Sequence, residues 1–253
     1  MTGPASPGEL PPPAPAPPHL HARAVPWRHA LAWFEEGMRL FKRGPAAWIG
    51  LGFCTLAVEL GLAALPHFGP LAAQLVAPLV AGGMACAADA ADHGGTPSLR
   101  HAVAAFGASW QALLALIVAN LVAFSGQWLA AWWIADINLL VPADTDGELS
   151  GAAISGMVAI GVLASLPFLF VPYHVLVERT GATDAFRASW MGFALNTEPL
   201  LVFAGAALAL VGLGVATMGL GLLLALPLLA TAGYAAWKDV FGVGTAPGRS
   251  LKP

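Results

Sequence analysis

Three polar side chains lie within apolar segments and are spaced so that they are expected at one depth of a bilayer. Glu59 lies between Val58 and Leu60, well inside the first apolar segment. A charge at the centre of a bilayer costs about 2.5–3.5 kcal/mol on insertion scales, so this acid must face a protein interior, stay protonated or have a partner. Counting inward from the expected outer helix ends places Gln74 and Gln127 near the same level. We predict a polar layer for a proton or a small solute; the alternative is a set of packing hydrogen bonds.

Three further acids lie at the C-terminal ends of apolar segments, on the side where the basic residues are concentrated. They are Asp89, Glu178 and Asp239. An acid at a helix C-terminus opposes the helix dipole by about 0.3–1 kcal/mol, so nearby bases are expected to compensate it. The expected bases are Arg39, Arg100 and Arg187. These six residues predict an acid–base lock on the cytoplasmic side, and the alternative is that all of them are solvated.

A proline precedes each of these acids by eleven or twelve residues. The three prolines are Pro78, Pro167 and Pro227. Proline inside a helix removes a hydrogen bond and bends the axis, so three kinks near mid-membrane are predicted. The regular spacing also predicts an internal repeat of one unit used three times.

The residue types that usually perform catalysis are not arranged for it. The sequence has no nucleophile elbow, no phosphate-binding glycine loop and no HExxH. Cys54 and Cys86 have no CxxC or histidine spacing around them and are expected to stay reduced. We therefore expect no catalytic residue, no metal, no cofactor and no enzyme.

The composition requires a bilayer as solvent. The chain is 58% hydrophobic and 10% charged, with a mean hydropathy of +0.73, whereas soluble domains carry about 25% charged residues. Six apolar segments follow one another at 46–65, 68–88, 109–134, 151–177, 199–217 and 221–240. They predict an all-α polytopic bundle of six transmembrane helices in three hairpins.

The eleven Lys and Arg residues are confined to alternate connections of this arrangement. The basic residues are Arg23, Arg28, Arg39, Lys42, Arg43, Arg100, Arg179, Arg187, Lys238, Arg249 and Lys252. Cytoplasmic loops collect Lys and Arg, so both termini are predicted inside. The other connections carry acids and no base, which argues against nucleic acid as a partner.

A short amphipathic segment precedes each predicted hairpin. Apolar residues recur at positions i, i+4 and i+7, which share one helix face. The three sets are Phe34, Met38 and Phe41; Leu99, Val103 and Phe106; and Phe186, Trp190 and Phe193. Each segment is predicted to be a short helix lying flat in the cytoplasmic headgroup layer.

The two ends of the chain differ from its middle. The first 26 residues contain nine prolines and are predicted to form a disordered cytoplasmic arm. Residues 27–242 form the predicted membrane domain, and 243–253 a flexible cytoplasmic tail.

Several stretches resemble a known family. These are LFKRGPAAWIGLG from Leu40, GPLAAQLVAPLVAGGMACAADA from Gly69, DAFRASWMGFALNTEPLL from Asp184 and GYAAWKDVF from Gly233. They look like a family of uncharacterised bacterial integral membrane proteins, with a more distant similarity to the membrane domain of glycerophosphodiester phosphodiesterases. The resemblance implies six spans in the bacterial inner membrane, and it carries over no activity and no catalytic residue.

Two functions fit these observations. The first is passage or sensing of a small solute. The second is a non-catalytic structural or assembly role beside other envelope components. The lipid bilayer is the expected partner in both, together with a membrane-protein partner or a second copy of the chain.

Overall fold

The described part of the protein is built from helices. The computed structural model describes residues 20–135, 139 and 151–244, and every regular element within them is helical. The elements are α1 His29–Phe41, α2 Pro45–Ala63, α3 Gly69–Asp92, η1 Leu99–Gly107, α4 Trp110–Ala135, α5 Gly151–Ser165, η2 Leu166–Phe168, η3 Tyr173–Val177, α6 Ala182–Leu195, α7 Thr197–Ala216 and α8 Leu222–Phe241. The predicted all-α class is confirmed for these residues.

Four of these helices are long and apolar enough to cross a membrane. They are α2, α3, α4 and α7. The predicted segment 151–177 instead consists of α5, which ends at Ser165, followed by η2 and η3. The segment 221–240 coincides with α8, whose last turns carry Lys238 and Asp239. The chain is therefore a helical membrane protein by length and composition, with four such helices among the described residues.

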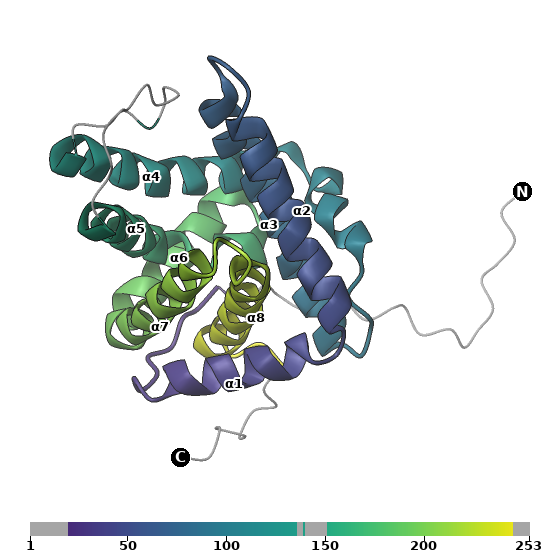
Figure 1. Ribbon diagram of the computed structural model, residues 1–253. Coiled ribbons are helices and arrows are strands. Elements are labelled where there is room, and N and C mark those ends of the chain that lie inside the picture. The colour runs from purple at the N-terminus through teal and green to yellow at the C-terminus, as the bar shows by residue number, and fades with distance from the viewer. Residues whose placement is uncertain (1–19, 136–138, 140–150, 245–253) are drawn as a thin grey trace, which may run out of the picture.

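Helices α1, α2, α3 and α7 contact α8, and α4 and α5 pack beside them (Figure 1). Helix α2 contacts α3, α4 contacts α5, and α7 contacts α8, while α1 lies along α8 at one end of the molecule. The half of α8 that ends at Phe241 is almost fully buried, with Tyr234, Trp237 and Val240 in the main core. Burying large aromatic side chains removes much apolar surface from solvent, so α8 is central to the main core.

Small residues on α1 allow its close packing with α8. The buried face of α1 consists of Ala30, Trp33, Gly37 and Leu40. A Cβ atom on Gly37 would lie 2.7 Å from the backbone nitrogen of Ala232, so no larger side chain fits there. This face lies one position away from the predicted anchors Phe34, Met38 and Phe41, because Ala30 and Gly37 allow close approach to α8 while Trp33 and Leu40 fill the core beside them.

The second and third amphipathic segments follow the same rule. In η1, a 3₁₀-helix, Ala102 and Ala105 are buried while Leu99, Val103 and Phe106 are exposed. In α6 the buried face is Ala185, Ala188, Ser189 and Gly192, and Trp190 is exposed. The predicted helices exist, but several of the predicted apolar anchors, namely Leu99, Val103, Phe106 and Trp190, point away from the bundle, whereas Phe186 and Phe193 are partly buried against the core.

The three prolines behave differently from one another. Pro78 and Pro227 lie inside the continuous helices α3 and α8. At Pro167 the α-helix ends and a 3₁₀ turn begins. The Ser189 hydroxyl of α6 donates to the Pro167 carbonyl at 2.8 Å and accepts from the Phe170 amide at 3.2 Å. This side chain satisfies backbone groups that the interrupted helix leaves without intrahelical partners.

The segment 20–28 corrects the prediction of a disordered arm up to Pro26. It runs beside α7 and α8 before α1 begins (Figure 1). The Asn196 side chain forms two hydrogen bonds with this segment. It donates to the Arg23 carbonyl at 3.0 Å and accepts from the Val25 amide at 2.8 Å. The Arg23 amide also donates to the Val240 carbonyl at 2.9 Å. Residues 1–19 and 245–253, and with them most of the predicted arm and tail, lie outside the described residues.

Candidate functional site

A groove between α2, α3, α4 and α5 brings the predicted polar layer together. Glu59, Gln74 and Gln127 all line it, in a cavity of about 280 Å³. Glu59 lies four residues before the end of α2 and Gln74 five residues after the start of α3. At about 1.5 Å of rise per residue, both lie within two turns of the α2–α3 connection. On α2 and α3 the groove therefore lies near their connection, whereas on α5 it is lined by residues from Val158 to Ser165, the half farther from the α4–α5 connection.

Asn120 of α4 extends this polar wall. Its amide nitrogen donates to the Gln74 side-chain oxygen at 2.9 Å and to the Gln74 backbone oxygen at 3.0 Å. The bond ties α4 to α3 across the groove. The amide nitrogen of Gln74 is left available because its oxygen is already the acceptor.

Glu59 is the only charged residue among those that line the groove. Its carboxylate makes no hydrogen bond and no ion pair to any residue that the structure describes, and its side chain is exposed on the groove wall. The other lining residues are the three amides, Ser165 and apolar side chains. This set can bind a group that donates hydrogen bonds or carries positive charge.

A second polar site lies at the opposite end of the bundle, around Asp239. Its side chain is only 4% exposed. Arg23 donates to Oδ1 at 2.8 Å and to the Asp239 backbone oxygen at 2.7 Å. His29 Nδ1 and Trp33 Nε1 both reach Oδ2, at 2.7 and 3.0 Å. A buried carboxylate with this many donors is a structural anchor, because it stays satisfied only while the segment 20–28 and α1 are in place.

Asp92, the last residue of α3, collects a second set of partners. Lys238 of α8 and Arg39 of α1 both form ion pairs with it. The Tyr234 hydroxyl donates to Asp89 at 3.1 Å and reaches Asp92 at 3.4 Å. Arg39 also binds Glu36, and this salt bridge raises the pKa of the Arg39 guanidinium above its usual value.

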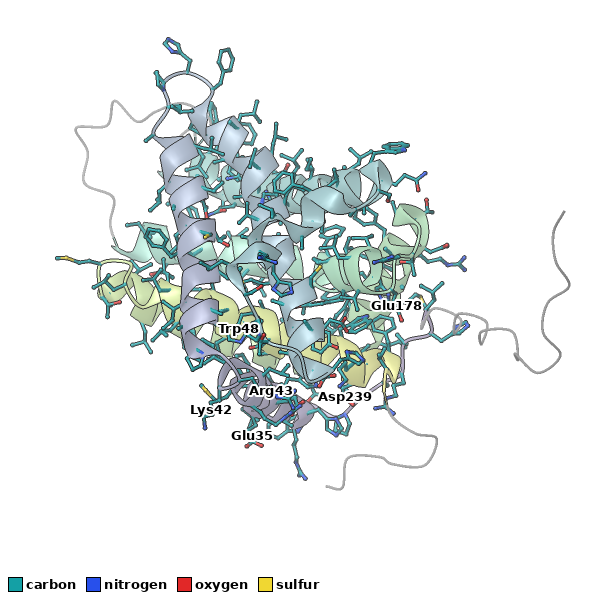
Figure 2. All side chains as sticks on the ribbon, turned by 90° about the vertical axis from the view of Figure 1, so that its right-hand side faces the viewer. Glu35, Lys42, Arg43, Trp48, Glu178 and Asp239 are labelled. Atoms are coloured by element: carbon teal, nitrogen blue, oxygen red, sulfur yellow. The ribbon has the colours of Figure 1, made fainter. Side chains whose placement is uncertain are left out.

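Arg43 completes the contact between α1 and the end of α3. It donates to the backbone carbonyl of Ala91, one of the last carbonyls of α3, which have no partner within their own helix. Figure 2 shows Arg43, Lys42, Glu35 and Asp239 at the same end of the molecule. Bases on α1 thus secure the end of α3.

The predicted acid–base lock pairs differently from the expectation. Asp239 binds Arg23 and His29 instead of Arg39, and Glu178 binds His174 at 2.8 Å. Arg100 and Arg187 form no ion pair with the described residues, so these two predicted bases of the lock are wrong. The physical reason is proximity. The segment 20–28 places Arg23 beside Asp239, and the π-helical turn Tyr173–Val177 places His174 beside Glu178.

His174 is fully buried next to Trp237 and Phe241. Within the described part of the chain, its Nε2 and the indole nitrogen of Trp237 are buried without hydrogen-bond partners. The π-helical turn that holds His174 is a feature often found at functional sites.

Sequence reasoning missed Arg23, His29 and Asn196. No periodic pattern marks them, because Arg23 lies in a proline-rich stretch and its partner Asp239 is 216 positions away. The described residues contain no group of three or more acidic, His or Cys side chains that could hold a metal ion.

Comparison with known proteins finds no match among protein-family models, curated proteins or solved structures. The groove and the two ion-pair sites are therefore interpreted from their own geometry.

Proposed function

We propose that the chain is a multi-pass protein of the bacterial inner membrane with both termini in the cytoplasm. The four apolar helices support its membrane character. For six spans, α5 with η2 and η3 supplies one further crossing and α8 the other. The restriction of Lys and Arg to alternate connections supports the orientation.

Within this frame, we propose that the groove between α2 and α5 binds a small cation or a proton for passage or sensing. The observation that carries the proposal is the meeting of Glu59, Gln74 and Gln127 in one groove that no basic side chain lines. An unpaired carboxylate beside apolar helices is costly, and a proton or a cation removes that cost. Amide oxygens supply further acceptors around the charge.

The sign of the charge distribution agrees with a cation. The connection between α4 and α5 carries Asp136, Asp144, Asp146 and Glu148 and no base. Acidic residues in an expected outer connection raise the local concentration of cations and lower that of anions on that side of the membrane.

The test is a flux measurement in proteoliposomes that contain the purified full chain. Proton entry is followed with a trapped pH dye and methylammonium entry with a radiolabel. The Glu59→Gln variant keeps the size of the side chain and removes its charge, so flux should fall at least about tenfold if the carboxylate contributes 1.4 kcal/mol or more. Glu35→Gln, which changes an exposed acid on α1, is the matched control and should leave flux unchanged.

Two results would reject this function. One is a wild-type chain that passes neither probe above empty vesicles. The other is a Glu59→Gln flux equal to wild type. If Glu59→Gln changes only the thermal stability, the groove serves packing, and the structural or assembly role replaces passage.

A further inference from the structure

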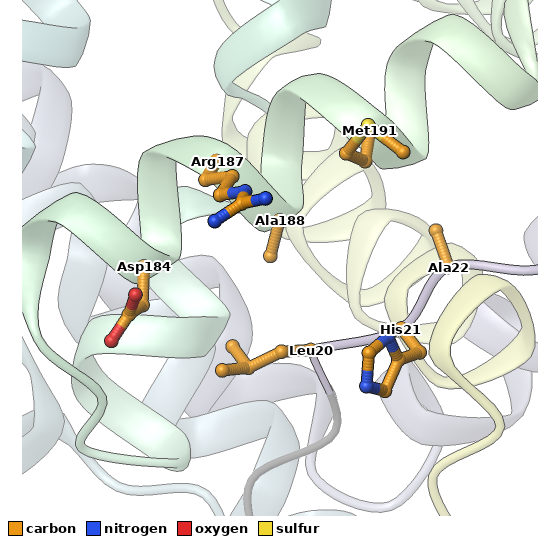
Figure 3. Close-up of a pocket in the computed structure, with 7 residues that line it drawn as sticks. All are labelled: Leu20, His21, Ala22, Asp184, Arg187, Ala188 and Met191. Atoms are coloured by element: carbon orange, nitrogen blue, oxygen red, sulfur yellow. The ribbon is translucent and has the colours of Figure 1, made fainter.

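A separate pocket lies where the segment 20–28 meets α6. It has a volume of about 340 Å³ and is lined by Leu20, His21 and Ala22 on one side. On the other side it is lined by Asp184, Arg187, Ala188 and Met191 of α6. Figure 3 shows the side chains of Asp184 and Arg187 on the helix wall, with Leu20 and His21 opposite them.

The walls of this pocket are held in place by contacts already described. Asn196 binds the backbone of Arg23 and Val25, and Asp239 binds the Arg23 side chain. On the other wall, Ala185, Ala188 and Gly192 press the inner face of α6 into the core. The pocket therefore exists before any ligand binds, which lowers the entropic cost of binding.

The pocket offers two opposite charges that no described residue pairs with. Arg187 and Asp184 lie one helical turn apart, and neither forms an ion pair or a side-chain hydrogen bond with the described residues, including each other. A guanidinium binds phosphate oxygens through two parallel N–H donors. A carboxylate accepts hydrogen bonds from an ammonium group. A ligand that carries both a phosphate and an ammonium would satisfy both side chains.

The exposed face of α6 continues from these charges into apolar surface. Trp190, Met191 and Leu195 follow Arg187, and Trp190 is 56% exposed. The distance from Asp184 to Leu195 along the helix is about 16 Å at 1.5 Å per residue. A ligand that fits this face has a charged head and an apolar tail.

We propose that the pocket binds a phospholipid whose headgroup carries a primary ammonium, as phosphatidylethanolamine does. The phosphate lies against Arg187, with His21 as a further donor from the segment 20–28. The ammonium donates to Asp184, and an acyl chain covers Met191 and Leu195. This site is independent of the groove at Glu59.

The test measures lipid binding to the purified full chain by native mass spectrometry. Three phospholipids with identical acyl chains are compared, with headgroups of ethanolamine, choline and glycerol, and phosphoethanolamine serves as the tail-free probe. Choline lacks N–H donors and glycerol lacks the positive charge. The ethanolamine lipid should bind at least about tenfold more tightly than the other two, because one hydrogen bond between charged groups has about this effect.

Variants of Arg187 and Asp184 test which part of the headgroup each charge binds. Arg187→Gln should weaken binding of all three lipids, whereas Asp184→Asn should remove only the preference for ethanolamine. Arg100→Gln is the matched control, since Arg100 is an exposed arginine on η1 without an ion pair among the described residues. Both pocket positions are exposed on α6, so the variants should fold, and an unchanged tryptophan fluorescence spectrum verifies this.

Equal binding of the three lipids would overturn the proposal. So would an Arg187→Gln variant that binds like wild type or loses no more than Arg100→Gln. Phosphoethanolamine that binds as tightly as the whole lipid would assign the site to a soluble phosphate instead.

Discussion

Asp239 concentrates the most specific interactions of the molecule on one buried carboxylate. Its partners Arg23, His29 and Trp33 all come from the first 33 residues, and they meet it at the end of α8. A buried acid normally favours folding only when donors surround it, since its desolvation must be offset. The beginning and the end of the described chain are thereby joined at one residue.

Asp239→Asn should lower the stability of the detergent-solubilised protein by about 1–3 kcal/mol, because it leaves donors without their acceptor. Arg23→Gln should cost less, since the Arg23 side chain is 44% exposed. The double variant should cost less than the sum of the two single variants, because each removes the same interaction. Thermal unfolding followed by tryptophan fluorescence measures all three, and Glu35→Gln is the control. Strictly additive losses would show that the two residues do not interact.

The elements of the bundle meet through their smallest residues. A Cβ atom added to Gly83 of α3 would lie only 1.9 Å from the backbone oxygen of His101 in η1. Gly37 approaches α8 in the same way, and Gly52 of α2 faces the Leu223 carbonyl and Pro227. Within a bilayer the hydrophobic effect does not drive helices together, because lipid tails are as apolar as the side chains. Helices associate instead by close backbone packing through small residues.

Gly83→Ala should therefore reduce the yield of folded protein strongly, since the added methyl group meets backbone and not a flexible side chain. Gly205→Ala is the matched control, because it lies in α7 with nothing within 4 Å of the added Cβ. The control should be neutral or more stable by up to about 1 kcal/mol, the usual gain of alanine over glycine in a helix. Yield of monodisperse protein by gel filtration compares them. Equal yields for the two variants would refute the contact between α3 and η1.

The helices could be predicted from the sequence better than their contacts could. Hydropathy predicts α2, α3, α4 and α7 as long apolar helices, and depth counting predicts Glu59, Gln74 and Gln127 at one level, where they line one groove. The buried face of α1 was missed, since Gly37 and Ala30 add little hydropathy while Phe34 and Met38 add much. The contact of Arg23 with Asp239 could not be predicted, because a proline-rich stretch has the composition typical of disordered segments. The partner that holds it in place lies 216 positions away in the sequence.

At the scale of the whole molecule, the proposed orientation assigns the ion-pair sites and the groove to different sides of a membrane. The anchored end holds Asp239, Asp92 and the bases of α1, whereas the groove with Glu59 lies toward the other end. Such separation is what the difference in Lys and Arg between alternate connections predicts.

Reporter fusions test this division directly. A reporter active only in the periplasm, inserted after Gly147, should be active, whereas the same reporter after Pro253 should be inactive. A reporter that fluoresces only in the cytoplasm should give the reverse pattern at the two positions. The six-span arrangement has three crossings between the two positions. Activity in the same compartment at both positions would mean an even number of crossings between them and would refute that arrangement.

Thiol labelling measures whether the groove is open to water and negatively charged. Gln127→Cys is introduced after Cys54→Ala and Cys86→Ala, and cells are treated with cationic and anionic methanethiosulfonates of similar size. Leu129→Cys, which is exposed on the outer face of α4, is the control and should react with neither reagent because lipid covers it. Position 127 should react faster with the cationic reagent, and adding Glu59→Gln should abolish the difference. Failure of position 127 to react, or equal rates with Glu59 intact, would contradict a cation-binding groove.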